Sequence, residues 1–298
     1  MKHQTSLDGP YHATWLQMLA LCPMKAKLSL EEPPQSTSLA QFKGSVVHRM
    51  LEIGSGDLFG AIQHCKEKLD APLIDEVDIG FSEECQEFFE GACKNAPQHE
   101  TTHTEFSFMT DIGGYQFEGT IDALWEMPNG EVWLVDWKTN KTLPSQFNLD
   151  NNLQFGVYAF MCRQHGIHID KIAWIHLRDW IPYKRASSKT NFATTTSLAQ
   201  WAAEQDFDIT PGGKSKLPVG SLRGPGVHLT QRTDAQLDEV EREVKRLVKM
   251  IKFNLYPRCM YDQVCSFCGY KLSCGATLEG RTNIKVPRNK EYREDEEG

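Results

Sequence analysis

The sequence predicts an α/β fold in which helices precede and follow a central group of strands. Apolar residues recur at three- and four-residue spacing between residues 39 and 94, which is typical of amphipathic helices. From about residue 102 the pattern changes to alternating apolar and polar residues between turn signals, which indicates strands. Helical spacing returns near residue 148 and again after Thr233.

The N-terminal part is expected to be helical. We predict helices over the following ranges: residues 12–21, 39–53, 57–69 and 81–94. The first helix runs into Cys22-Pro23, and the prolines Pro33 and Pro34 break the chain before the second.

Strands are expected in the middle of the chain, at residues 103–109, 115–125 and 131–137. Asp111–Gly114 is predicted to form the first turn, and Pro128-Asn129-Gly130 the second. A helix over residues 148–164 and a strand over residues 171–177 should follow.

Residues 184–228 are rich in Ser and Thr, then in Gly and Pro, which predicts a long loop. A loop of this length is either functional or a tolerated insertion. Its basic side chains are Lys184, Arg185, Lys189, Lys214, Lys216 and Arg223. Thr233 then begins a helix with an apolar stripe that ends at Ile251.

Composition excludes some classes of protein. The chain has 298 residues, of which 40% are hydrophobic, but it lacks the run of about 18–20 apolar residues that a membrane span needs. The N-terminus has no apolar signal-peptide region, so we expect a cytoplasmic protein. The net charge is -8, but nine of the acidic side chains fall in residues 66–90, so a polyanionic partner is not excluded.

Two carboxylates and a lysine occur near the ends of neighbouring strands. Asp122 ends the segment Gly-Thr-Ile-Asp, and Asp136 is followed two residues later by Lys138. Because strand side chains alternate, these groups can share one face and hold Mg²⁺ or Mn²⁺ beside an ammonium group. The alternative interpretation is a pair of surface acids with a nearby lysine.

Two further patterns flank these acids. His48 lies on a predicted helix before the strands, and Gln154 and Tyr158 share one face of the helix after them. A single His on a helix is more often structural than functional, so the information lies in the order and spacing of the whole set.

From Cys22 to Cys274 this ordered set resembles the RecB-type branch of the PD-(D/E)xK nuclease superfamily. The resemblance implies a restriction-endonuclease-like mixed central sheet flanked by helices. It also implies metal binding by His48, Asp122, Asp136 and the backbone carbonyl of Trp137, a catalytic Lys138, and DNA contacts from Gln154 and Tyr158. Glu105 occupies a position that is often acidic in the family, and its role is left open. Asp136 replaces the Glu that is more frequent before the x-Lys pair.

Nine cysteines in a chain without an export signal suggest a use for thiolates. Cys265, Cys268 and Cys274 form a C-x2-C-x5-C pattern, and the fourth ligand is either Cys259, which would suggest zinc, or the distant Cys22. The resemblance to iron–sulfur RecB-type nucleases implies Cys22 and a 4Fe–4S cluster that joins the N- and C-terminal helical parts, with Cys259 as a spare thiol. The other four cysteines are expected to be buried: Cys65, Cys85, Cys93 and Cys162.

The resemblance is to stand-alone nucleases of CRISPR adaptation and their phage relatives, and it implies the cytoplasm of a bacterial or phage-infected cell. It implies a metal-dependent DNA exonuclease that prefers single-stranded ends, with 5′→3′ polarity, in CRISPR adaptation or phage DNA recombination. DNA and the protein partners of such complexes are the expected partners. The alternatives are a DNA-binding or processing subunit that cleaves weakly, and a zinc-stabilised structural protein. Four aromatic residues could stack on bases or belong to the core: Trp137, Trp174, Trp180 and Tyr183.

The predicted organisation is one nuclease domain over residues 1–298. Its parts are a helical region (1–100), a catalytic core (101–180), the loop (184–228), a helix with the cysteine cluster (232–275) and a disordered acidic tail (285–298).

Overall fold

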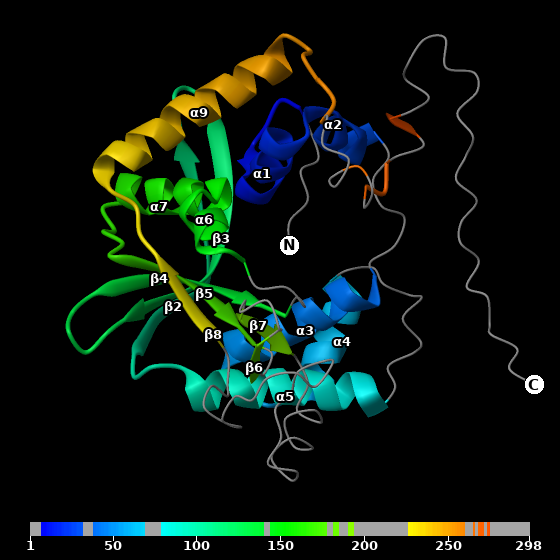
Figure 1. The fold of residues 1–298 in the computed structure, drawn as a ribbon, viewed down its shortest axis with the longest axis vertical. Coiled ribbons are helices and arrows are strands. Elements are labelled where there is room, and N and C mark those ends of the chain that lie inside the picture. The colour runs from blue at the N-terminus through cyan, green and yellow to red at the C-terminus, as the bar shows by residue number, and fades with distance from the viewer. Residues whose placement is uncertain are drawn as a thin grey trace, which may run out of the picture.

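The structure is a computed structural model with a mixed α/β fold, in which a central sheet lies between two layers of helices (Figure 1). It describes residues 7–31, 38–68, 79–139, 144–177, 181–184, 190–193, 226–259, 265, 268–270 and 273–274.

The central sheet is mixed. It has six strands in the order β1 (Tyr11–His12), β3 (Gln116–Glu126), β4 (Val132–Lys138), β5 (Lys171–His176) and β8 (Gly226–Thr230), and β2 (Glu100–Asp111) also pairs with β3. The β1–β3 and β4–β5 pairs are parallel, and the other pairs are antiparallel. A separate antiparallel pair joins β6 (Ile181–Lys184) to β7 (Thr190–Ala193).

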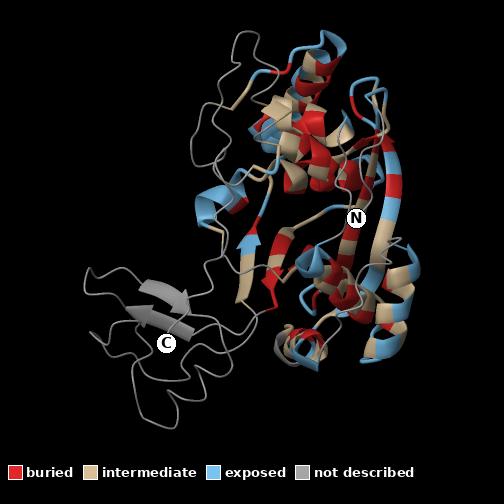
Figure 2. Cartoon of the chain, turned by 90° about the vertical axis from the view of Figure 1, so that its right-hand side faces the viewer, coloured by how far each residue is buried: buried red, intermediate tan, exposed pale blue. Residues whose placement is uncertain are grey.

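Each face of the sheet has its own hydrophobic core. One core holds residues of α1 (Ala13–Leu21), α7 (Leu153–Gln164) and α9 (Asp234–Lys252), and the other holds residues of α3 (Leu39–Ile53), α4 (Leu58–Lys68) and α5 (Ile79–Asn95). Neighbouring strand residues serve opposite cores: Leu134 packs in the first and Val135 in the second. Figure 2 shows these buried positions along the strands and on the inner sides of the helices. The sheet is therefore covered on both faces, which explains the largely apolar sequence of β4 and β5.

Local signals explain where the flanking helices begin. Ser38 and Thr233 each form a capping box, because the side chain accepts from the third helical N–H while a glutamine side chain accepts from the cap N–H. Gly54 ends α3 in the left-handed conformation, with φ 62°.

Most of the predicted helices and strands are confirmed. The short strands β1 and β6 were not predicted, and there are three larger differences. Residues 23–31 form a helix, α2 (Pro23–Glu31), that was not predicted, although Pro23 at its first position is a known start signal. The helix expected over residues 148–164 is two helices, α6 (Gln146–Asp150) and α7. They separate because Asn152 caps α7 by accepting from the Phe155 N–H at 3.0 Å.

The third difference concerns the predicted loop at 184–228. Its last residues begin β8, which pairs with β5, and β7 also lies within it. Residues 185–189 and 194–225, and the predicted acidic tail at 285–298, lie outside the described residues. In the described part of the chain, no helix has the length and apolar character of a membrane-spanning segment.

Candidate active site

Glu105 and Asp122 occupy opposing positions on β2 and β3. The flanking residues are in register, with Thr104 opposite Ala123 and Phe106 opposite Ile121. Glu105 has a φ of 45°, a conformation that side chains other than glycine rarely adopt. This distortion falls at the point where the two carboxylates meet, and such local backbone strain often accompanies functional sites.

The strands β3 and β4 separate next to Asp122. Their last registered pair towards this end joins Ala123 and Val135, so Asp122 and Asp136 each lie one residue beyond it. The Trp137 N–H donates to Asp122 Oδ2 at 2.7 Å. A side chain therefore replaces the backbone acceptor that a continued ladder would provide, and it fixes the Asp122 carboxylate between the two strands.

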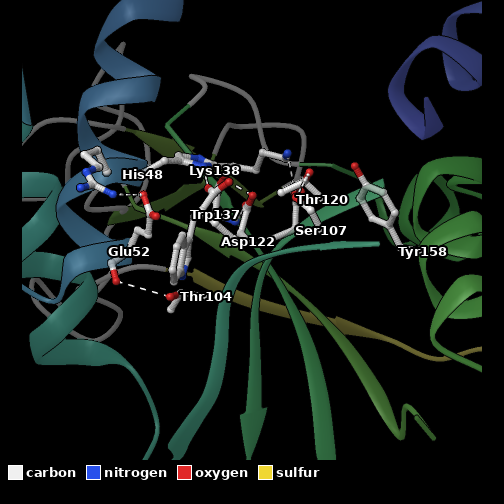
Figure 3. Close-up of polar contacts among 12 residues, drawn as sticks. His48, Glu52, Thr104, Ser107, Thr120, Asp122, Trp137, Lys138 and Tyr158 are labelled. Atoms are coloured by element: carbon white, nitrogen blue, oxygen red, sulfur yellow. Dashed lines mark hydrogen bonds and ion pairs between the residues drawn. The ribbon is translucent and has the colours of Figure 1, made fainter. Parts of the chain in front are cut away.

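His48 reaches these strands from α3. Its Nδ1 lies 3.4 Å from Asp122 Oδ1 and 4.0 Å from Glu105 Oε1. Its Nε2 lies 2.9 Å from the carbonyl oxygen of Trp137, and its ring meets the Trp137 indole edge-on (Figure 3). Because a carbonyl oxygen can only accept, Nε2 carries a proton and Nδ1 is the nitrogen that faces the carboxylates.

Lys138 forms a close ion pair with Asp136. The distance from Lys138 Nζ to Asp136 Oδ2 is 2.6 Å, and the side chains are 19% and 6% exposed. The ammonium group also lies 5.4 Å from the ring centroid of Trp174, whose Cα is the β5 partner of Asp136. The charge is thus held by a carboxylate on one side and an aromatic face on another.

Burial and mutual charge shift the pKa values of these groups. Burial raises the pKa of Asp136 to about 6, although the Lys138 ammonium opposes this rise. Burial also acts to raise the pKa of Asp122, but the charge and hydrogen bond of His48 outweigh it, and that pKa is lowered. For His48, the Asp122 carboxylate overcomes the opposing effect of burial, so its pKa is raised. The pKa of Glu105 is raised, by burial first and then by Asp122.

Three of these side chains can hold a metal ion together. One ligand atom each from His48, Glu105 and Asp122 lies within 4.8 Å of the others. Carboxylate oxygens with one imidazole suit a divalent cation such as Mg²⁺ or Mn²⁺. The donors present therefore fit the metal that the sequence suggests.

The structure brings together most of the predicted metal ligands. His48 contacts Asp122 through Nδ1 and the Trp137 carbonyl through Nε2, and Asp136 lies nearby but faces Lys138. The motif analysis left the role of Glu105 open. The signal that places it is strand register: the pairing runs without a shift from the turn to Phe106–Ile121 and Thr104–Ala123, and Glu105 lies between these pairs.

Gln154 and Tyr158 lie together on α7, as predicted. Gln154 Nε2 donates to the Tyr158 hydroxyl at 3.3 Å. Tyr158 packs against Gly119 of β3, where an added Cβ would lie 3.2 Å from the tyrosine ring. The glycine therefore permits this close approach beside the strand that carries Asp122.

Two of the four aromatic candidates are resolved by their packing. Trp137 is 4% exposed and belongs to the hydrophobic core. Trp174 is half-buried and covers Lys138. Trp180 and the side chain of Tyr183 lie outside the described residues.

A second cluster of reactive side chains lies where α1 and α2 meet the C-terminal segment. The Met24 N–H donates to the Pro257 carbonyl at 3.3 Å, which joins the two ends of the chain next to Cys22. Burial raises the pKa of the Cys265 and Cys274 thiols, and nearby Cys22 and Cys268 raise both further. Cys259 acts on Cys265, whose thiol lies 3.6 Å from the Cys259 carbonyl. The four predicted cluster ligands therefore lie in one region, but among the described residues their thiols do not form a group at metal-binding distance.

The remaining cysteines follow the prediction with one exception. Cys65, Cys85 and Cys162 are buried, as expected. Cys93 is exposed, so the prediction for it was wrong. It lies near the end of α5, where the helix leaves the core.

Comparison with solved structures finds two distant similarities. A structure described as SSO0001 is 15% identical, with a TM-score of 0.39, over 93% of this chain and 89% of that chain. A candidate exonuclease from Eubacterium rectale is 14% identical, with a TM-score of 0.49, over 88% of this chain and 92% of that chain. These values are too low to identify a substrate or an activity. Comparison with curated proteins gives no match.

The family comparison is more extensive. The sequence model of the PD-(D/E)XK nuclease superfamily matches residues 13–275, which include both strand acids, Lys138, His48 and the C-terminal cysteines. The mixed sheet between helical layers agrees with this match. The chain therefore belongs to the PD-(D/E)XK nuclease superfamily.

Proposed function

We propose that this protein is a Mg²⁺- or Mn²⁺-dependent DNA exonuclease. The observation that carries the proposal is the contact of His48, Glu105 and Asp122 beside the buried Asp136–Lys138 pair. Oxygen and imidazole donors lie next to a fixed ammonium group there, and phosphodiester hydrolysis needs both kinds of group.

Each residue has a defined task in this proposal. His48, Asp122 and Asp136 hold the metal, with the Trp137 carbonyl and Glu105 as further ligands. A bound divalent cation would polarise the scissile phosphate and lower the pKa of a water molecule. Lys138 stabilises the negative charge that develops on the phosphate, and Asp136 keeps its ammonium group in place at 2.6 Å.

The finer substrate assignment rests on the order of the motifs. Gln154 and Tyr158 form a hydrogen-bonding pair beside β3 and contact the DNA backbone near the metal. We assign a preference for single-stranded ends, 5′→3′ polarity and a role in CRISPR adaptation or phage recombination, with protein partners from such a complex. The support is the resemblance to RecB-type nucleases with the same N- and C-terminal cysteine pattern.

We also propose a 4Fe–4S cluster held by Cys22, Cys265, Cys268 and Cys274. Both candidates for the fourth ligand lie near the C-terminal cysteines, because Cys259 and Cys22 raise the pKa of Cys265 and Cys22 also raises that of Cys274. The choice of Cys22 as the fourth ligand rests on the resemblance to iron–sulfur nucleases. Such a cluster would join the first helices to the C-terminal segment. The one-domain organisation follows from this link, because residues 1–100 and 232–275 would then be closed around the catalytic core.

The proposed function is tested with end-labelled DNA. Single- and double-stranded oligonucleotides are incubated with the full chain in Mg²⁺, in Mn²⁺ and in EDTA, and a block on either the 5′ or the 3′ end reports polarity. We expect stepwise shortening of single strands with either metal, and protection by the 5′ block alone. Protection by the 3′ block, or release of internal fragments, would contradict the assigned polarity or the exonuclease mode. No cleavage with any substrate would contradict the proposal itself.

A further inference from the structure

Two hydroxyl groups lie next to the candidate metal site on the same pair of strands. Ser107 of β2 and Thr120 of β3 are registered partners, and their hydroxyl oxygens are 2.7 Å apart. Ser107 follows Glu105 by two residues, and Thr120 precedes Asp122 by two. Two residues of a strand span about 6.6 Å, which is close to the length of one nucleotide in an extended strand.

This hydroxyl pair is open to a ligand. Ser107 is exposed and Thr120 is half-buried, and Met109, the next residue of β2 on the same side, is 53% exposed. Figure 3 shows Ser107 and Thr120 between Asp122 and Tyr158. A strand that enters the metal site along β2 and β3 would therefore meet these hydroxyls.

The hydrogen-bond pattern leaves a donor for that ligand. Within the pair, one hydroxyl donates to the other, so the second hydroxyl keeps its own hydrogen. Tyr158 packs on the face of β3 that carries Gly119, whereas the side chain of Thr120 alternates to the other face.

Phosphate oxygens match these hydroxyls better than bases do. Hydroxyl groups commonly donate to the phosphates of nucleic acids, and such contacts fix the position of the strand without reading its sequence. The carboxylates of Glu105 and Asp122 lie on one side of the hydroxyl pair. Uncharged hydroxyls can donate to a phosphate there without forming ion pairs with these carboxylates.

We propose that Ser107 and Thr120 form a binding subsite for the phosphate next to the scissile one. This inference rests on the proposed nuclease function and adds two residues to its substrate contacts. The subsite takes the sugar–phosphate backbone of a nucleic acid, one nucleotide away from the metal. It holds that phosphate while the carboxylates and Lys138 act on the scissile bond.

The test combines substitutions with modified DNA. Ser107→Ala and Thr120→Val, alone and together, remove the hydroxyls with little change in shape, and Thr120→Ser restores one. Thr101→Val replaces an exposed threonine farther along β2 and is the matched control. The substrates carry a neutral methylphosphonate at single positions on either side of the scissile bond, and thermal unfolding confirms that each variant is folded.

We expect KM to rise about tenfold in the double variant with kcat nearly unchanged, since a hydrogen bond to a charged group contributes a comparable factor. Methylphosphonate at one adjacent position should slow wild type and Thr101→Val but have little effect on the double variant. Thr120→Ser should recover most of the loss. Equal sensitivity of the double variant and wild type at every position would overturn the subsite. That outcome leaves wild-type cleavage intact, whereas failure of the proposed function would appear as absence of wild-type cleavage.

Discussion

Glu105 and Asp122 face each other across β2 and β3, and the imidazole of His48 lies within 4.0 Å of both carboxylates. Two carboxylates this close repel each other, and the raised pKa of Glu105 reflects both its burial and that repulsion. A divalent cation would remove the repulsion. The pair therefore gives a direct way to test whether a third acidic ligand belongs to the site.

We expect Glu105→Gln to weaken Mn²⁺ binding and to lower cleavage at limiting metal, because one charged ligand becomes neutral. Excess metal should restore part of the activity. Calorimetric titration of the protein with Mn²⁺ measures the change directly. Glu126→Gln alters an exposed acid on β3 and should bind Mn²⁺ as wild type does. Unchanged affinity in Glu105→Gln would remove Glu105 from the ligand set.

The metal-free protein should lose stability as pH rises from about 4 to 6. Burial raises the pKa of Asp136 to about 6, so the folded state binds more protons than the unfolded state between its ordinary pKa and that value. The raised pKa of His48 acts in the same direction, because its contribution is lost as pH rises through the folded-state pKa. Thermal unfolding in EDTA across this range measures the trend. Asp136→Asn should make stability depend less on pH at the lower end of this range. An unchanged dependence in that variant would contradict the raised pKa of Asp136.

The cysteine ligands can be separated by iron content and visible absorbance. Cys22→Ser should lose the brown colour and the bound iron, because the proposed centre needs all four thiolates. Cys259→Ser is the matched control and should keep both. Iron that persists in Cys22→Ser and disappears in Cys259→Ser would make the ligand set local. A colourless wild type that contains zinc would exclude the iron–sulfur cluster.

Arg232 should be important for stability although it lies outside the metal site. Its guanidinium donates to the carbonyls of Leu149 and Asn152, at 2.8 and 3.3 Å, where α6 ends and α7 begins. Arg232→Met would leave these carbonyls without that partner, at a cost of about 1–3 kcal/mol in the free energy of unfolding. Urea unfolding measures this cost, and Arg232→Lys should lose less. An unchanged unfolding midpoint in Arg232→Met would show that water replaces the guanidinium at no cost.

The sequence predicts the parts of the site that depend on local pattern. Asp122, Asp136 and Lys138 stand near the ends of strands that alternation identifies, and His48 and Tyr158 lie on helices with clear apolar spacing. Their meeting point depends on how β3 and β4 separate after Ala123 and Val135, which requires the three-dimensional sheet.

Other features depend on long-range pairing and were missed for that reason. β8 follows a stretch rich in Gly and Pro and becomes a strand through its pairing with β5. The position of Glu105 opposite Asp122 depends on the pairing of β2 with β3, and the break between α6 and α7 is stabilised by Arg232 from a distant segment. In each case a partner far along the chain determines the local structure.

The central claim is that Asp122 and Lys138 act in metal-dependent cleavage of DNA. The most direct measurement compares cleavage of end-labelled single-stranded DNA by wild type, Asp122→Asn and Lys138→Ala at saturating Mg²⁺ or Mn²⁺, with folding checked by circular dichroism. The account predicts metal-dependent cleavage by wild type and a loss of at least about 100-fold in both folded variants. Cleavage near the wild-type rate by either folded variant, or cleavage by wild type that continues in EDTA, would contradict it.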